Sequence, residues 1–167
     1  SSDGRRQRSE RSRATIVEAV LGFLREGDTS PSSSEIADRA GVTQRTVFNH
    51  FTDMEALMFA VVRKHAEHIL PLVPPADPSG TVGERIDRYC AAIAAIAEES
   101  QNIRWAAVTH PTGTRYSMGV QYMRELLRER MLGTFPAELD ALPPAQRDRV
   151  LALLEVAIDP LVWRIRR

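Results

Sequence analysis

The stretch SSSEIADRAGVTQRTVFNHF at residues 32–51 decides the fold. It predicts two short helices joined by a tight turn. Ser32 is a good N-cap, and Glu35, three residues later, completes a capping box. Gly41 is expected to end the first helix because it can enter the left-handed conformation, and Thr43 is expected to cap the second helix. This layout is typical of a helix-turn-helix.

The helical spacing assigns faces to this segment. Ile36, Ala37 and Ala40 supply a small apolar face, and Val42 is expected to fill the angle between the helices. Three further apolar side chains are expected to point inward: Val47, Phe48 and Phe51. The side chains left pointing outward are Gln44, Arg45, Thr46, Asn49 and His50.

The outward set has the chemistry of a DNA-reading helix. Glutamine and asparagine pair with adenine edges, and arginine forks onto guanine. Hydroxyls and histidine can donate to phosphates, which fixes register without reading sequence. The expected DNA contacts in this segment are therefore Ser32, Ser34, Thr43, Gln44, Arg45, Thr46, Asn49 and His50. The alternative interpretation is an ordinary helical hairpin with a polar solvent face, but the combination of caps, turn and side chains favours DNA binding.

The segment resembles the DNA-binding region of the tetracycline-repressor (TetR) family of bacterial regulators. The matching residues are Ile36-Ala37, Ala40-Gly41-Val42-Thr43, Thr46-Val47-Phe48-Asn49-His50-Phe51 and Glu55-Ala56-Leu57, within about a sixth of the chain. Two positions depart from the family pattern. Phe48 stands where tyrosine is usual and Met54 where lysine is common, so fewer phosphate contacts are expected.

Composition agrees with a DNA-binding protein that has a local basic segment. The 167 residues carry a formal net charge of zero, but residues 1–13 are rich in arginine. Arg5, Arg6 and Arg8 in this arm are expected to contact phosphate, and a merely solvated terminus is the alternative. Cys90 is the only cysteine, so no intrachain disulfide can form. With no long apolar run and no signal peptide in view, a cytoplasmic protein without membrane contact is expected.

The rest of the chain predicts helices and no strands, so the fold class is all-α. Helices are expected at about 9–26, 53–70 (capped by Thr52 or Asp53), 81–100, 103–109, 114–133 and from 144 onward, with a non-helical linker at 71–78. The expected domains are residues 1–52, the basic arm with the three-helix DNA-binding domain, and residues 53–167. The resemblance implies that the second domain binds a ligand and dimerises.

The last predicted helix is apolar on more than one side. Its apolar residues are Val150, Leu151, Leu153, Leu154, Val156, Ile158, Leu161, Val162 and Ile165. Such a helix needs more than one neighbour, either a partner chain or a further helix. In the TetR family the last two long helices form a four-helix bundle between two copies. The sequence stops where this helix is still expected to run, so the family's last helix is missing from the expected domain.

Aromatic and sulfur side chains of the second domain suggest a ligand pocket. The candidates are Tyr89, Cys90, Ile93, Trp105, Met118, Tyr122, Met123 and Trp163. Tyr122 and Trp105 are the first choices, because each offers a large face and one hydrogen-bonding atom. Plain core filling is the alternative for each residue. The resemblance implies that some of them surround a small, mostly apolar effector.

An enzyme is not expected. His65 and His68 share a helical face, but no third metal ligand accompanies them at a suitable spacing. No nucleophile elbow or phosphate-binding glycine loop is found, so no metal, cofactor or catalytic residue is expected. The expected function is a homodimeric repressor that binds a near-palindromic operator and is released by the effector. The alternatives are an activator, a ligand-independent regulator, or a protein-interaction module that uses the last helix.

Overall fold

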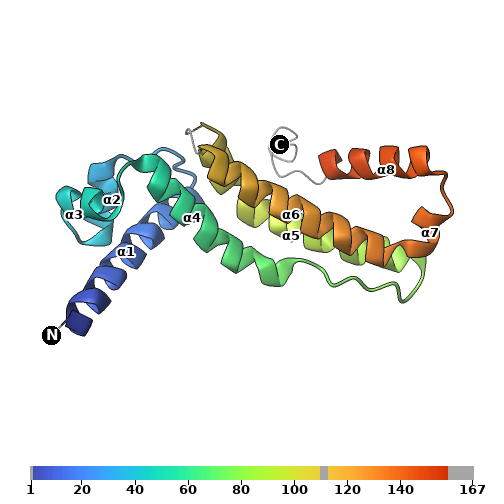
Figure 1. Cartoon of the computed structure of the whole chain (residues 1–167), viewed down its shortest axis with the longest axis horizontal. Helices are drawn as coiled ribbons and strands as arrows, with labels where there is room; N and C mark the ends of the chain where they lie inside the picture. Colours follow the sequence, from blue (N-terminus) through green and yellow to red (C-terminus); the bar gives the residue numbers. More distant parts are fainter. Residues whose placement is uncertain (1, 110–112, 158–167) are drawn as a thin grey trace. The chain divides into compact units, whose positions relative to one another are not determined.

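The structure is a computed structural model, which describes the backbone of residues 2–109 and 113–157 and the side chains of residues 4–107 and 121–157. Its elements in chain order are α1 (Ser2–Arg25), α2 (Ser33–Ala40), α3 (Gln44–His50), α4 (Met54–Ile69), the 3-10 turn η1 (Leu70–Leu72), α5 (Val82–Thr109), α6 (Gly113–Thr134), α7 (Pro136–Asp140) and α8 (Pro144–Ala157) (Figure 1). No strand occurs in the described residues. The all-α fold class is confirmed.

The chain divides into two compact units. The first comprises Ser1–Ala66 and Asn102–Tyr116, and the second comprises Glu67–Gln101 and Ser117–Arg167. The division therefore falls inside α4, whereas the boundary predicted from the sequence lies in front of this helix, between residues 52 and 53. The reason is the burial of Leu57, Met58 and Val61, because these residues on the first turns of α4 belong to the core of the first unit.

The core of the first unit forms around the apolar stripe of α1. Ile16, Val20 and Leu24 are completely buried and pack with Ile36 of α2 and Val47 of α3. These three residues of α1 are spaced four apart, which places them on one side of the helix. The helix begins earlier than predicted, however, since α1 extends back to Ser2 through the arginine-rich segment.

The core of the second unit joins four helices. Tyr89 and Ile93 of α5 pack with Met131 of α6, Leu139 of α7 and Leu151 of α8. The Tyr89 hydroxyl also donates a hydrogen bond of 3.0 Å to the carbonyl oxygen of Leu127, which fastens α5 to α6. On this face of α5, Tyr89, Ile93 and Ile96 are buried, whereas Val82 and Ile86 nearer the start of the helix are 43% and 46% exposed.

Three local predictions in this region were wrong. The segments 81–100 and 103–109 form one helix, α5, because neither glycine nor proline separates them. Residues 136–140 were expected in a loop but form α7, in which Pro136 occupies the first helical turn, where proline is tolerated. The linker also begins with the short turn η1, again with a proline at its start.

The linker after η1 is held against the second unit. Arg85 donates a hydrogen bond of 2.8 Å to the carbonyl oxygen of Pro78, and Arg88 donates one of 2.9 Å to that of Ser79. A Cβ atom on Gly133 would lie only 2.6 Å from the Cβ of Ala76. Glycine is therefore needed where the linker crosses α6.

Helix α8 is buried on one side and open on the other. Leu151 is buried in the second core, whereas Leu153 is 66% exposed and Val156 is 61% exposed. These exposures agree with a helix that is apolar on more than one side. The predicted continuation with Ile158, Pro160, Leu161, Val162 and Ile165 lies outside the described residues.

Candidate DNA-binding surface and ligand pocket

Capping interactions fix both ends of α2 and the start of α3. The Ser32 amide donates to the Glu35 carboxylate at 2.8 Å, and the Glu35 amide donates to the Ser32 hydroxyl at 3.3 Å, which is the predicted capping box. The hydroxyl of Ser32 also donates to that carboxylate, and these bonds hold the pKa of Glu35 below its usual value. Gly41 has φ +66° and ends α2 in the left-handed conformation. The Thr43 hydroxyl then accepts the Thr46 amide at 3.1 Å as the cap of α3.

The exposed face of α3 differs from the predicted one at three positions. Gln44, Arg45 and Asn49 are exposed as predicted. Phe48 was expected inside but is 50% exposed. Thr46 and His50 were expected to point outward but are half-buried.

The pitch of the helix explains this correction. Val47 and Phe51 are four residues apart, lie on one side and are both buried. Phe48 follows Val47 by one residue and so is turned away from it by about 100°. The seven-residue helix α3 packs on its neighbours through the side that carries Val47, so the side that carries Phe48 stays exposed.

Some of the predicted contact residues are engaged within the DNA-binding unit. The Gln44 amide nitrogen donates a bond of 2.6 Å to the Ser33 hydroxyl, which orients this side chain from α2. The hydroxyls of Thr43 and Thr46 lie 2.8 Å apart and share a hydrogen bond. Ser34 is exposed, whereas the Ser32 hydroxyl is used in the cap.

Arg39 fixes the position of α2 on α1. Its guanidinium lies 4.3 Å from the centre of the Phe23 ring and donates to both carboxylate oxygens of Glu26. It also passes directly over Gly22, where an added Cβ would meet the guanidinium carbon at 3.1 Å. Helix α2 is thus oriented on α1 by the ion pair of Arg39 with Glu26 and by the close approach of Arg39 to Gly22.

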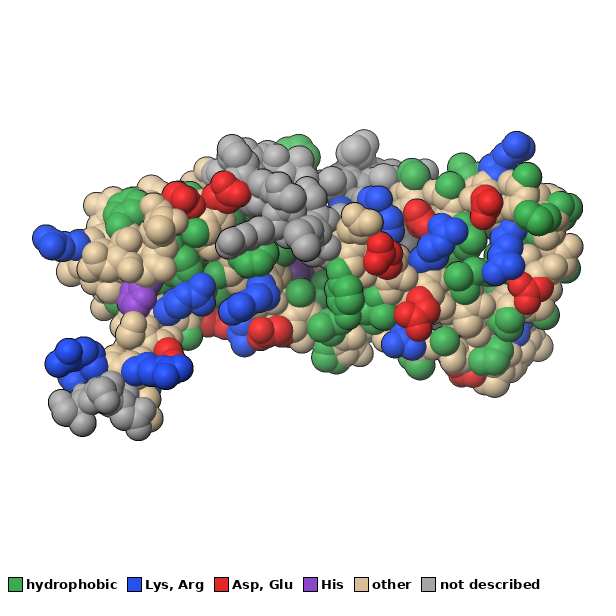
Figure 2. Space-filling model, viewed as in Figure 1, with side chains coloured by type: hydrophobic (Ala, Val, Ile, Leu, Met, Phe, Trp, Pro, Cys, Tyr) green, Lys and Arg blue, Asp and Glu red, His purple; other side chains and the backbone are tan. Residues whose placement is uncertain are grey.

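The basic arm is a helical extension beside the end of α3. Arg5, Arg6 and Arg8 are exposed, and Arg6 forms an ion pair of 3.1 Å with Glu10. Arg13 lies 4.8 Å from the centre of the Phe51 ring, which connects α1 to the end of α3. Figure 2 shows Lys and Arg side chains gathered on this part of α1. The arm therefore presents positive charge within the same unit as the reading helix.

The second unit contains an apolar pocket of about 680 Å³. Helix α5 contributes Val82, Ile86, Tyr89, Cys90 and Ile93, α6 contributes Met131, the segment around α7 contributes Phe135, Glu138, Leu139 and Leu142, and α8 contributes Val150, Leu154 and Ala157. A volume of this size suits a small organic molecule. The exposed fractions of Val82 and Ile86 fit this site, since both side chains line the pocket instead of the closed core.

The pocket has few polar groups. Burial raises the pKa of Tyr89 to about 12, and its ring meets Phe135 edge-on at 6.0 Å. Glu138 forms an ion pair with Arg85 of α5, and Arg85 is almost completely buried. The second carboxylate oxygen of Glu138 is buried and accepts no hydrogen bond from the described residues. The site therefore offers a large apolar lining with one charged pair at its wall.

The predicted pocket residues separate in the structure. Tyr89, Cys90 and Ile93 do line the pocket, and Met123 packs against the same core without lining it. The two first choices do not line it: Tyr122 is 59% exposed, and Trp105 belongs to the first unit. Met118 and Trp163 lie outside the described side chains.

A group of pocket-lining residues around α7 was not predicted from the sequence. Phe135, Leu139 and Leu142 were overlooked because their segment was predicted to be a loop. The apolar spacing of Phe135 and Leu139, four residues apart, was the signal that could have revealed a helical turn.

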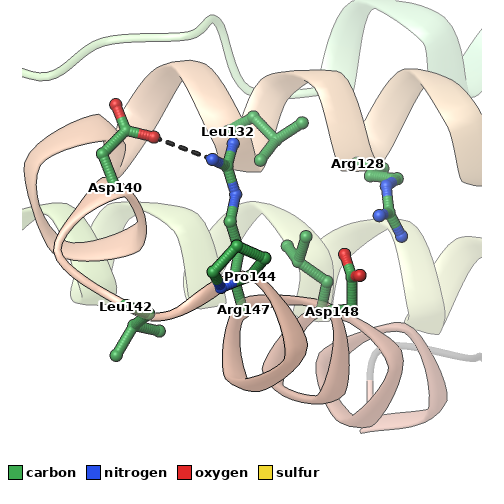
Figure 3. A pocket seen from close by; sticks show the side chains of 8 residues that line it. Arg128, Leu132, Asp140, Leu142, Pro144, Arg147 and Asp148 are labelled. Carbon is green, nitrogen blue, oxygen red and sulfur yellow. Dashed lines mark hydrogen bonds and ion pairs between the residues drawn. The ribbon is translucent and has the colours of Figure 1, made fainter.

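A second cavity, of about 470 Å³, lies between α6, α7 and α8 and is more polar (Figure 3). Arg147 donates to Asp140 at 2.9 Å, and Arg128 donates to Glu155 at 2.6 Å. Its arginines are thus already bonded to carboxylates of the same unit. The apolar pocket is the better candidate for a ligand.

The described residues show no metal centre. They contain no group of three or more histidine, cysteine, aspartate or glutamate side chains that could hold an ion. His65 is buried, and His68 lies 3.7 Å from Glu99. Across the same described part of the chain, none of the helices combines the length and apolarity that a membrane crossing requires.

The first unit defines a helix-turn-helix DNA-binding protein, with a capped turn and an exposed reading helix next to a basic arm. Residues 23–61 match the family of bacterial regulatory proteins called the tetR family. The matched residues cover the helix-turn-helix and the start of α4, so this part of the chain is similar to the DNA-binding domain of tetR-family transcriptional regulators.

The fold is also similar to a solved structure. The match is a transcriptional regulator from Rhodococcus sp. Rha1, with a TM-score of 0.61 and 18% sequence identity, and it covers 91% of this chain and 82% of that chain. At this identity the likeness supports the fold. No curated protein matches the sequence.

Proposed function

We propose that this chain is a repressor that binds an operator and dissociates from it when a small, mostly apolar effector binds. The observation that carries the proposal is the apolar pocket in the second unit of a chain whose first unit binds DNA. The buried carboxylate oxygen of Glu138 adds one acceptor to this lining. An apolar effector with a single hydrogen-bond donor would suit that combination.

The proposed assembly is a homodimer on a near-palindromic operator. One reading helix offers few base contacts, whereas two related by a dyad double the readout. Half-sites would then lie about 34–36 Å apart. The open apolar side of α8, which includes Leu153 and Val156, supports this arrangement because a two-fold axis lets one such surface cover its own copy.

Helix α4 is the proposed link between effector and DNA. Its first half carries Leu57 and Val61 of the first core, and its last residue, Ile69, belongs to the second core. An effector that prefers the conformation with poor DNA affinity would shift α4 and misplace the reading helices. By linkage, DNA must weaken effector binding by the same factor.

DNA-release measurements test this proposal. The operator is first selected from a random duplex library, and its affinity is then measured by fluorescence anisotropy with a panel of apolar compounds that carry one amine or hydroxyl. A true effector lowers operator affinity, and saturating operator lowers effector affinity equally. Ile86→Trp, which enlarges a partly exposed side chain of the pocket wall, should abolish the response and leave operator binding unchanged. Compounds that occupy the pocket without changing operator affinity would instead support a ligand-independent regulator.

An activator, or a module that binds a protein partner through α8, is the second candidate. The exposed apolar side chains of α8 are the observation that favours a protein partner. A reporter gene placed behind the selected operator separates repressor from activator by the sign of the response. A chain that remains monomeric while α8 still captures a second protein would favour the interaction module.

A further inference from the structure

Among the side chains that the structure describes in the first unit, the most exposed aromatic one lies on the reading helix. Phe48 is 50% exposed, while its apolar neighbours Val47 and Phe51 are buried. A single exposed apolar residue on a protein surface is common and by itself has no special meaning. The position of Phe48 on α3 is what gives this exposure significance.

Phe48 lies inside the polar face that can read bases. At about 100° per residue, Phe48 lies about 40° from Gln44 and about 60° from Arg45 around the helix axis. The exposed residues Gln44, Phe48, Arg45 and Asn49 therefore follow one another in an arc around the helix, with Phe48 between Gln44 and Arg45. Thr46 and His50 lie outside this arc and are half-buried. Any surface that meets Gln44 and Arg45 must also meet the Phe48 ring.

The major groove offers one apolar group to such a ring. Phosphates and most base edges present hydrogen-bonding atoms, whereas thymine carries a 5-methyl group that makes apolar contacts, including contacts with phenylalanine. Phe48 has no hydroxyl and cannot bond a phosphate. Placing its ring against hydrogen-bonding groups would desolvate them without compensation.

We propose that Phe48 is a specificity-determining residue that reads the 5-methyl group of a thymine in each half-site of the operator. Its neighbours on the arc flank this contact with polar readout. The Gln44 side chain, oriented by its 2.6 Å bond from the amide nitrogen to the Ser33 hydroxyl, lies on one side of the ring. Arg45 lies on the other side. The contact is made by the DNA-binding unit and does not require the proposed effector, and only its repetition in each half-site rests on the proposed dimer.

Removing the methyl group alone tests the proposal. In the selected operator, each thymine is replaced in turn by deoxyuridine, which keeps the base pair and loses the 5-methyl group. We expect wild-type affinity to fall about three- to five-fold at the contacted thymine of a half-site, the loss expected for one buried methyl group. Phe48→Ala should lower affinity for the thymine operator by at least this factor and should bind the thymine and deoxyuridine forms equally well.

Two variants control for indirect effects. Phe48→Tyr keeps the ring and should keep the preference for thymine. Asn49→Ala removes another exposed side chain of the same helix and should also keep that preference. Circular dichroism and thermal unfolding check that Phe48→Ala stays folded, which its half-exposed position predicts.

Three results would overturn the proposal. The wild type could be indifferent to deoxyuridine at every thymine. Phe48→Ala could keep the full preference for the methyl group. Phe48→Ala could also weaken binding equally for all sequences, which would place the ring against the sugar–phosphate backbone.

Discussion

The first unit, which carries the reading helix, and the second unit, which carries the apolar pocket, are specified by the sequence in different ways. In the first, local signals specify the backbone: the Ser32–Glu35 capping box, the left-handed Gly41 and the Thr43 cap occur within a dozen residues. In the second, the pocket is assembled from α5, α6, α7 and α8, which are distant in sequence. No single segment of the second unit contains enough of the lining residues to predict the pocket from its sequence alone.

The position of the reading helix and the choice of its exposed side chains are therefore determined by different interactions. Caps and turns place α3 reproducibly, because each uses hydrogen bonds between residues close in the chain. Which side chains of α3 remain exposed depends on packing against α1 and α2. The same holds more strongly for the pocket, whose lining includes a short helix that local sequence did not predict. Local sequence therefore specifies the helices, whereas packing between helices decides which of their residues are exposed or line the pocket.

The largest effect is expected where α8 remains open. Leu153→Glu, or Val156→Glu, places a charge on this apolar side and should dissociate the proposed dimer while the monomer stays helical. Operator affinity should fall toward the non-specific level, a loss of about a thousand-fold or more. Sedimentation and anisotropy measure the two effects. Gln146→Glu, an exposed position at the polar start of α8, is the matched control. A dimer that persists in both variants would locate the interface elsewhere.

The next effect concerns base readout by α3. Arg45→Ala should cost about 1–3 kcal/mol on the preferred operator and relax specificity at one base pair. Gln44→Ala should relax a different base pair, and Ser33→Ala should mimic it weakly by releasing the Gln44 amide from its bond. Selection profiles of the three variants provide the measurement. Profiles identical to the wild type would remove both residues from base recognition.

The basic arm should affect affinity without affecting specificity. Deleting residues 1–8 removes Arg5, Arg6 and Arg8 but leaves the core, whose first buried residue is Ile16. If all three arginines contact phosphate, the slope of log K against log salt should flatten by up to about 3 units, equally for all sequences. Replacing the three arginines with glutamine tests the charge without shortening α1. An unchanged slope would make the arm a solvated helical end.

The smallest effect compares one substitution in the two units. Gly41→Ala should destabilise the fold by about 1–2 kcal/mol, because φ +66° strains any residue with a Cβ and no neighbouring atom lies within 4 Å of the added carbon. Gly83→Ala, in the first turns of α5 and equally free of neighbours, should stabilise by about 0.4–1 kcal/mol. Urea unfolding of both variants measures the two signs. Equal effects would contradict the role given to the left-handed turn.

The sequence by itself determined the helix-turn-helix, the inner stripe of α1 and the all-helical class. It could do so because caps, left-handed glycine and helical periodicity act over at most a few turns. It also selected Tyr89, Cys90 and Ile93 by their side-chain type, and these three residues line the apolar pocket.

The tertiary structure alone decided the exposure of Phe48, the half-burial of His50 and the separation of Trp105 and Tyr122 from the pocket. Each of these depends on which neighbouring helix covers which side of an element. A periodic pattern records that a helix has an apolar side, but not how wide the covered side is or which distant segment covers it. That width is set by packing between helices, because the covering residues come from elsewhere in the chain.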